Sequence, residues 1–165
     1  MAYESLNNLL DTFIKAAKDD EYWAGALYTC SDDNTVFLIK RSGIMNNPNL
    51  WDVPGGRSDK KDDSPEDTAK RELTEELGTL PENAEFIKKH ILSENKDRYV
   101  YIYKLSQEAK EKWMPKLKLN KESSTAAWFK LDKLPSKTNF DLSWVPKELQ
   151  KSASLIKIAS VTTQP

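Results

Sequence analysis

The chain has 165 residues, enough for one domain with its own hydrophobic core and short for two. Its 25 basic and 26 acidic residues nearly cancel, so we expect no strong electrostatic attraction to nucleic acid or to an anionic membrane. The longest nearly unbroken apolar run, residues 23–28, is far shorter than the roughly 20 residues of a membrane-spanning helix. Cys30 and His90 are single, which excludes an internal disulfide and metal sites rich in cysteine or histidine.

The first predicted element is an amphipathic helix over residues 3–18, and we treat residues 1–20 as a helical extension. Its apolar side chains recur at helical spacing: Leu6, Leu9, Leu10, Phe13, Ile14 and Ala17. No secretory signal pattern precedes residue 21, so we expect a cytoplasmic protein. Two strand patterns, residues 22–30 and 35–41, flank the polar residues 31–34 and predict a hairpin.

The remaining elements follow a helix and further strands. The pattern predicts strands over residues 84–92, 98–105 and 125–131, and it is ambiguous over residues 106–121. Pro146 sits at a predicted first helical position, so a C-terminal helix closes a domain of residues 21–165. This order of elements indicates a single α+β domain with a mixed sheet between helices.

The best-defined predicted helix spans residues 65–77. Ser64 is a suitable N-cap, Pro65 suits the first helical position, and Gly78 suits the left-handed residue that ends a helix. Ala69, Leu73 and Leu77 share one stripe of this helix and are expected to pack on the sheet.

Three carboxylates lie beside that stripe, at Glu72, Glu75 and Glu76. Like charges at these spacings repel by roughly 0.2–0.5 kcal/mol per pair, and the helix dipole disfavours anions in the last turn. A divalent cation would turn this repulsion into attraction, and all-oxygen ligands favour Mg²⁺ or Mn²⁺. Such helices are more often merely solvated, but the preceding Gly55-Gly56 loop lets a backbone approach an anion or a metal closely.

Residues 56–79 resemble the signature of the Nudix hydrolases, G-x5-E-x7-R-E-U-x-E-E-x-G-U, in which U is a bulky aliphatic residue. The second half matches residues 71–78, which read Arg-Glu-Leu-Thr-Glu-Glu-Leu-Gly. The hairpin before it and the strand and turn after it also resemble the family, so the resemblance covers roughly residues 22–135. It implies an α/β/α sandwich and a metal-dependent hydrolase that cleaves the pyrophosphate linkage of a nucleoside diphosphate derivative.

The resemblance also implies roles for individual residues. Glu72, Glu75 and Glu76 would bind Mg²⁺ or Mn²⁺, the Gly56 carbonyl would be a further ligand, and Glu72 would orient or deprotonate the attacking water. The chain departs from the signature in three places. Asp63 replaces the first glutamate, which would orient Arg71; the loop from Gly56 to Asp63 is one residue longer; and Thr79 stands at the last aliphatic position.

Further candidates lie outside the signature. Glu122 resembles an additional acidic ligand or base of the family, although it also suits an exposed loop. Arg41 is a candidate to bind a substrate phosphate, together with Gly55 and Gly56. Tyr101 is a candidate to stack on a base, although aromatic residues at strand spacing are more often core; the same holds for Trp51, Trp113 and Phe129.

Several alternatives stay open at this stage. A catalytically weak Nudix domain could bind a nucleotide as a sensor or scaffold, and an isoprenoid-diphosphate isomerase would need Cys30 in the site. Nucleoside triphosphates, dinucleoside polyphosphates, nucleotide sugars and capped RNA are all candidate substrates, with long RNA disfavoured by the neutral charge. The N-terminal helix is expected either to pack on the domain or to form a dimer contact, so a homodimer is a further alternative.

Overall fold

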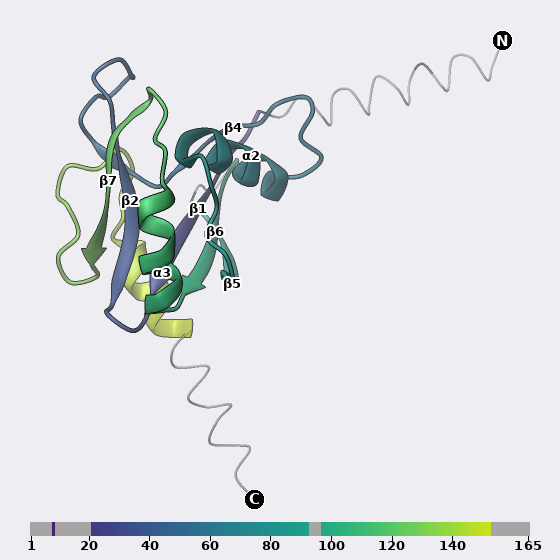
Figure 1. Ribbon diagram of the computed structural model, residues 1–165. Coiled ribbons are helices and arrows are strands. Elements are labelled where there is room, and N and C mark those ends of the chain that lie inside the picture. Colours follow the sequence, from purple (N-terminus) through teal and green to yellow (C-terminus); the bar gives the residue numbers. More distant parts are fainter. Residues whose placement is uncertain (1–7, 9–20, 93–96, 153–165) are drawn as a thin grey trace, which may run out of the picture.

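The structure, a computed structural model, describes residue 8, residues 21–92 and residues 97–152 (Figure 1). The predicted N-terminal helix lies outside the described residues, apart from residue 8, and so does the end of the C-terminal helix. The division into an extension, residues 1–20, and a domain, residues 21–165, therefore stays a prediction. In the described part of the chain, no helix is both long and apolar enough to cross a membrane.

The domain is built on a seven-stranded sheet in which strands β3-β2-β1-β6-β5 lie side by side, with β4 paired to β1 and β7 paired to β2. The strands β1 and β6 are parallel and the other pairs are antiparallel, so the sheet is mixed as predicted. The strand bounds are Trp23–Cys30 (β1), Thr35–Arg41 (β2), Trp51–Asp52 (β3), Gly55–Arg57 (β4), Glu85–Ile91 (β5), Arg98–Leu105 (β6) and Ser123–Lys130 (β7).

Helices cover both faces of the sheet (Figure 1). Helix α2, Pro65–Leu77, and helix α3, Gln107–Trp113, lie over one face, and a short 3-10 turn, Met114–Lys116, follows α3. The C-terminal helix begins at Trp144, two residues before its predicted start, and covers the other face with Val145 and Leu149. Two hydrophobic clusters result, one on each face, and the predicted α/β/α arrangement is confirmed.

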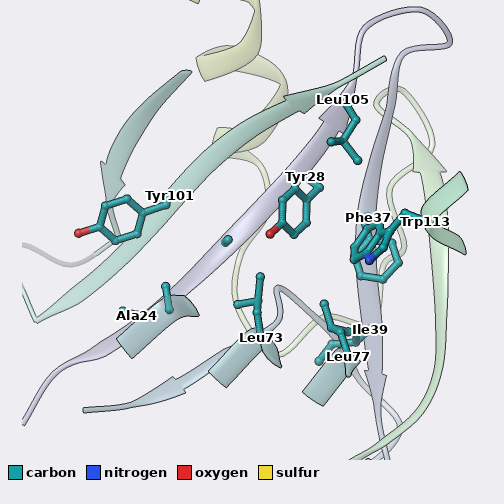
Figure 2. Packing of buried hydrophobic residues seen from close by; sticks show 11 residues of the cluster. Ala24, Tyr28, Phe37, Ile39, Leu73, Leu77, Tyr101, Leu105 and Trp113 are labelled. Atoms are coloured by element: carbon teal, nitrogen blue, oxygen red, sulfur yellow. The ribbon is translucent and has the colours of Figure 1, made fainter. Parts of the chain in front are cut away.

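The first cluster contains the face of α2 that the sequence predicted. Figure 2 shows Leu73 and Leu77 of α2 directed at the sheet, and both are essentially inaccessible to solvent. Trp113 of α3 lies beside Phe37, with ring centroids 4.7 Å apart, and it contacts Tyr28 at 5.0 Å. These rings fill the space where β1 and β2 separate, because those strands pair only at Thr29 and Cys30 in β1.

The ambiguous stretch, residues 106–121, contains α3, whose N-terminus Ser106 caps. The Ser106 hydroxyl accepts a hydrogen bond from the Ala109 amide at 3.1 Å. The buried Lys110 then donates to Asp33 and Thr35 in the β1–β2 hairpin. These contacts join segments distant in sequence, which is why periodicity alone left the region ambiguous.

Candidate active site

Helix α2 delivers a carboxylate to the boundary between core and solvent. Ser64 caps the helix by accepting from the Asp67 amide at 3.2 Å, and Gly78 ends it with a positive φ of 76°. Because Leu73 and Leu77 are buried against the sheet, Glu76 beside them is only 6% exposed. One of its oxygens, Oε2, accepts a hydrogen bond from the Gly55 amide at 2.9 Å. Helix α2 is therefore tied to β4 through the side chain of Glu76.

Three other acids interact electrostatically with the Glu76 carboxylate. Burial raises the pKa of Glu76 to about 9, the Gly55 hydrogen bond opposes this effect, and the charges of Glu72, Asp52 and Glu122 raise the pKa further. Burial likewise raises the pKa of Glu72, with Glu75 and Glu122 adding to the effect. We call Asp52, Glu72, Glu76 and Glu122 the acidic cluster. Glu122, a candidate from the sequence, thus interacts electrostatically with Glu72 and Glu76 of α2.

Gly56 leaves room for the Glu72 carboxylate. A Cβ atom at Gly56 would lie 2.2 Å from both Cδ and Oε2 of Glu72, closer than any normal contact. The other oxygen of Glu72, Oε1, accepts from Arg71 Nη1 at 2.7 Å. The Glu72 carboxylate thus lies between strand β4 and Arg71.

We expect Gly56→Ala to lower catalytic activity much more than stability. The added methyl group must displace the end of the Glu72 side chain, which is flexible, so the fold can absorb the change while the carboxylate moves. Steady-state hydrolysis and thermal unfolding, measured on the same samples, check this separation. Gly43→Ala is the matched control, because nothing lies within 4 Å of a Cβ at Gly43. Equal activity of Gly56→Ala and wild type would contradict this assignment of Glu72.

Arg71 is the centre of an ion-pair network at the start of this site. Its Nε and Nη2 donate to the two oxygens of Asp62 at 3.0 and 2.9 Å, and Nη2 also donates to the Arg57 carbonyl. Glu75, exposed over 57% of its side chain, pairs with Arg71 at 3.4 Å. The guanidinium of Arg71 holds the pKa of Asp62 far below its usual range.

The prediction that Asp63 orients Arg71 is wrong, because Asp62 fills that role. Asp63 is exposed, whereas the Asp62 side chain is 5% exposed. Five residues separate Gly56 from Asp62, which is the spacing of the signature, so the extra residue lies between Asp62 and the helix instead. Counting from Gly56 rather than from Arg71 would have found this acid. The Thr68 hydroxyl also donates to Asp62, at 2.8 Å.

We expect Asp62→Asn to reduce activity roughly 10- to 100-fold, as for residues that position metal ligands, and to lower the free energy of unfolding by about 1–3 kcal/mol. Asp63→Asn, its neighbour and control, should stay within about 0.5 kcal/mol. Because the pKa of Asp62 is lower in the folded than in the unfolded state, its stabilisation is present above the unfolded pKa, about 3.9, and is lost as the pH falls toward the folded pKa. Urea unfolding from pH 2 to 7 measures this dependence, and equal curves for the two variants would contradict it.

Of the other predicted residues, Arg41 contacts the acidic cluster, whereas Tyr101 and Cys30 lie elsewhere. Arg41 ends β2 and donates to Asp52 Oδ2 at 3.3 Å and to the Asn46 carbonyl at 2.9 Å. Tyr101 is only 7% exposed in the core, which is the alternative that the sequence left open for it. Cys30 is buried at the far end of β1 from Gly25, where β4 pairs, so it is not part of the cluster.

Asp52 was missed by the sequence analysis. It is 4% exposed, and burial raises its pKa to about 6 although Asn139 and Arg41 both donate to its Oδ2 atom. Its Oδ1 atom is buried without a hydrogen-bond partner. No periodic pattern distinguishes this aspartate from a turn residue, because its partner Asn139 lies far along the chain.

Among the described residues, no group of three or more His, Cys, Asp or Glu side chains already has the spacing of metal ligands. The donor set nevertheless fits a hard cation: carboxylates that mutually raise their pKa values, with a Gly-Gly strand beside them.

The fold and this cluster define a class, an α+β domain whose acidic helix lies against a Gly-Gly strand. The family model of the NUDIX domain matches residues 23–147, and the chain belongs to this family. By that membership it is a Nudix-type pyrophosphohydrolase, an enzyme that acts on phosphoanhydride bonds. A comparison with curated protein sequences gave no match.

Solved structures support the same fold. A Nudix hydrolase from M. smegmatis, RenU, is 17% identical, with 82% of this chain and 86% of that chain covered and a TM-score of 0.59. A C. elegans Ap4A hydrolase, solved as a binary complex, is 17% identical over 82% of this chain and 98% of that chain, with a TM-score of 0.57. DR0079 from Deinococcus radiodurans is 18% identical over 77% and 81%, with a TM-score of 0.57. At 17–18% identity, these structures show a shared fold.

Proposed function

We propose that the protein hydrolyses a phosphoanhydride bond in a nucleoside diphosphate derivative, with Mg²⁺ or Mn²⁺ as the cofactor. The observation that carries the proposal is the buried Glu76 carboxylate, whose pKa is raised to about 9 among other acids. Such a cluster is unfavourable without a cation and strongly attractive to one. We infer that its purpose is to hold dications against a polyanionic substrate.

Glu72, Glu75, Glu76 and Glu122, with the Gly56 carbonyl, are the proposed metal ligands. Carboxylate and carbonyl oxygens match the preference of Mg²⁺ and Mn²⁺. When bound, such ions neutralise phosphate oxygens and lower the pKa of a coordinated water. The proposed part of Glu72 is to orient or deprotonate the attacking water.

The basic residues have two separate tasks in this proposal. Arg71 keeps the Glu72 and Glu75 carboxylates in place, because it donates to both while Asp62 holds its other edge. Arg41 is the proposed phosphate contact. Its Nε and Nη1 atoms are engaged by Asn46 and Asp52, which orient the guanidinium and leave the remaining N–H groups for a substrate oxygen.

The substrate class is proposed as a nucleotide-type small molecule: a nucleoside triphosphate, a dinucleoside polyphosphate or a nucleotide sugar. The similar C. elegans structure is an Ap4A hydrolase, which supports a place for dinucleoside polyphosphates in this group. A net charge of -1 disfavours long RNA, which leaves a capped RNA end as the nucleic-acid candidate. The single buried Cys30 suits a reducing compartment, and we place the enzyme in the cytoplasm. The sensor alternative relied on the altered acid and longer loop, and the Asp62–Arg71 pair removes that reason.

A hydrolysis panel tests the proposal. The three substrate classes and a capped RNA oligonucleotide are incubated with Mg²⁺, with Mn²⁺ or with EDTA, and products are separated by anion exchange. We expect cleavage of at least one nucleotide substrate that EDTA abolishes and added Mg²⁺ restores. No cleavage with either metal, or equal cleavage in EDTA, would overturn the proposal.

A further inference from the structure

An apolar surface is open at the β5 edge of the sheet. Phe86 and Ile91 of β5 are 52% and 40% exposed. In the register of β5 with β6 they lie opposite Tyr103 and Tyr99, both partly exposed, and the Phe86 and Tyr103 rings are 5.7 Å apart. These four side chains share one face of the two strands, and we call them the β5–β6 face.

Helix α2 lies over the same side of the sheet but leaves this face open. It packs on β1 and β4 and touches β6 only marginally. Exposed aromatic and aliphatic side chains gathered on an edge strand are a surface that soluble proteins usually cover. Lys89, at 5.5 Å from the Tyr99 ring, adds a positive charge to its border.

The N-terminal segment leaves the fold beside the β5–β6 face. Tyr22, immediately before β1, meets Tyr99 edge to face with ring centroids 5.8 Å apart. Trp23 then pairs with Arg98 at the start of β6. Residues 1–20 therefore join the described fold next to Tyr22, which contacts Tyr99 of this face.

The sequence of the same segment has apolar residues on one face of its predicted helix. The spacing of Leu9, Leu10 and Phe13 with their neighbours predicts a helix over residues 3–18. A helix of that length spans about 24 Å, and the seven residues of β5 span about 23 Å. The polar side of this predicted helix carries Glu4 and Asp11 together with Lys15 and Lys18, so its charges nearly cancel and the apolar stripe is the part that needs cover. We propose that residues 1–20 of the same chain dock on the β5–β6 face through this stripe.

Amide hydrogen exchange on the full-length protein tests this docking. We expect slow exchange in residues 3–18 of the wild type, which Phe86→Ser and Phe13→Asp each accelerate by about tenfold or more. Glu85→Ser and Thr12→Asp are neighbouring controls on exposed or polar positions, and they should change exchange less than about twofold. Because Phe13 precedes β1 in the sequence, Phe13→Asp changes no residue of the sheet and keeps the test valid if Phe86→Ser does not fold.

Two results would overturn the proposal. One is exchange in residues 3–18 that the Phe86 and Phe13 variants leave unchanged relative to their controls. The other is a dimer in light scattering whose protection of residues 3–18 disappears on dilution, because a second copy would then cover the face. A monomer with concentration-independent protection supports docking within one chain. Metal-dependent hydrolysis should be unaffected by these variants, so failure here is separable from failure of the proposed function.

Discussion

Replacing Glu76 by glutamine is expected to abolish hydrolysis and, at the same time, to make the metal-free protein more stable at pH 8. The unfolded chain releases the proton of this glutamate near pH 4.3, whereas burial raises the folded-state pKa to about 9. Wild-type stability therefore falls as the pH rises between these values, because the folded state holds a proton that the unfolded state has lost. Glutamine removes that penalty and can still accept the Gly55 hydrogen bond.

The measured changes should have opposite signs. One pKa unit corresponds to about 1.4 kcal/mol, so we expect the unfolding free energy in EDTA at pH 8 to rise by at least about 1 kcal/mol. Turnover should fall at least about 100-fold, and the melting temperature should gain less from added Mg²⁺ than in the wild type. Glu66→Gln on the same helix is the control, since Glu66 forms an exposed pair with Lys70. A Glu76→Gln variant that keeps full turnover would remove Glu76 from the site.

Gly55→Ala should cause the largest loss of stability of any single methyl addition near the site. A Cβ there would lie 2.4 Å from Gly25 Cα and 2.5 Å from the Ala24 carbonyl oxygen, and these backbone atoms cannot move without separating β4 from β1. The positive φ of 156° adds backbone strain. We expect a loss of about 3 kcal/mol or more, at the upper end of the range for overpacking.

Urea unfolding of Gly55→Ala beside Gly56→Ala and Gly43→Ala measures the contrast. The Gly56 change meets only a flexible side chain and the Gly43 change meets nothing, so both should unfold close to the wild type. Hydrolysis by Gly55→Ala should fall as well, because the Gly55 amide holds Glu76. Unfolding of all three variants at the same urea concentration would contradict the close approach of β1 and β4.

Sequence reasoning succeeded where the controlling interactions are local. Helix α2 runs over the predicted residues, Pro65–Leu77, because its N-cap, its proline and its terminal glycine lie within one turn of its ends. Strand β6 also has its predicted bounds, since its alternation reflects burial on both faces. The signature correctly indicated the family.

The failures came from contacts between distant residues. Asp52 accepts a hydrogen bond from Asn139, 87 positions away, and Lys110 of α3 donates to Asp33 in the first hairpin. The choice between Asp62 and Asp63 depended on loop geometry, because the turn from Asp59 to Asp62 folds one carboxylate inward and leaves the next in solvent. Because Asp62 and Asp63 are adjacent and identical, a sequence pattern cannot decide which of them pairs with Arg71.

The position of the extra loop residue shows that one part of this loop has a constrained length and another part does not. From Gly56 to Asp62 the count is constrained, since both residues are fixed to α2 through Glu72 and Arg71. Between Asp62 and Ser64 the chain only has to reach the helix, and the spare residue, Asp63, bulges into water. A homologue with further residues inserted between this acid and the helix would keep the same site geometry. A motif search that requires a fixed number of residues between the acid and the arginine would nevertheless miss it.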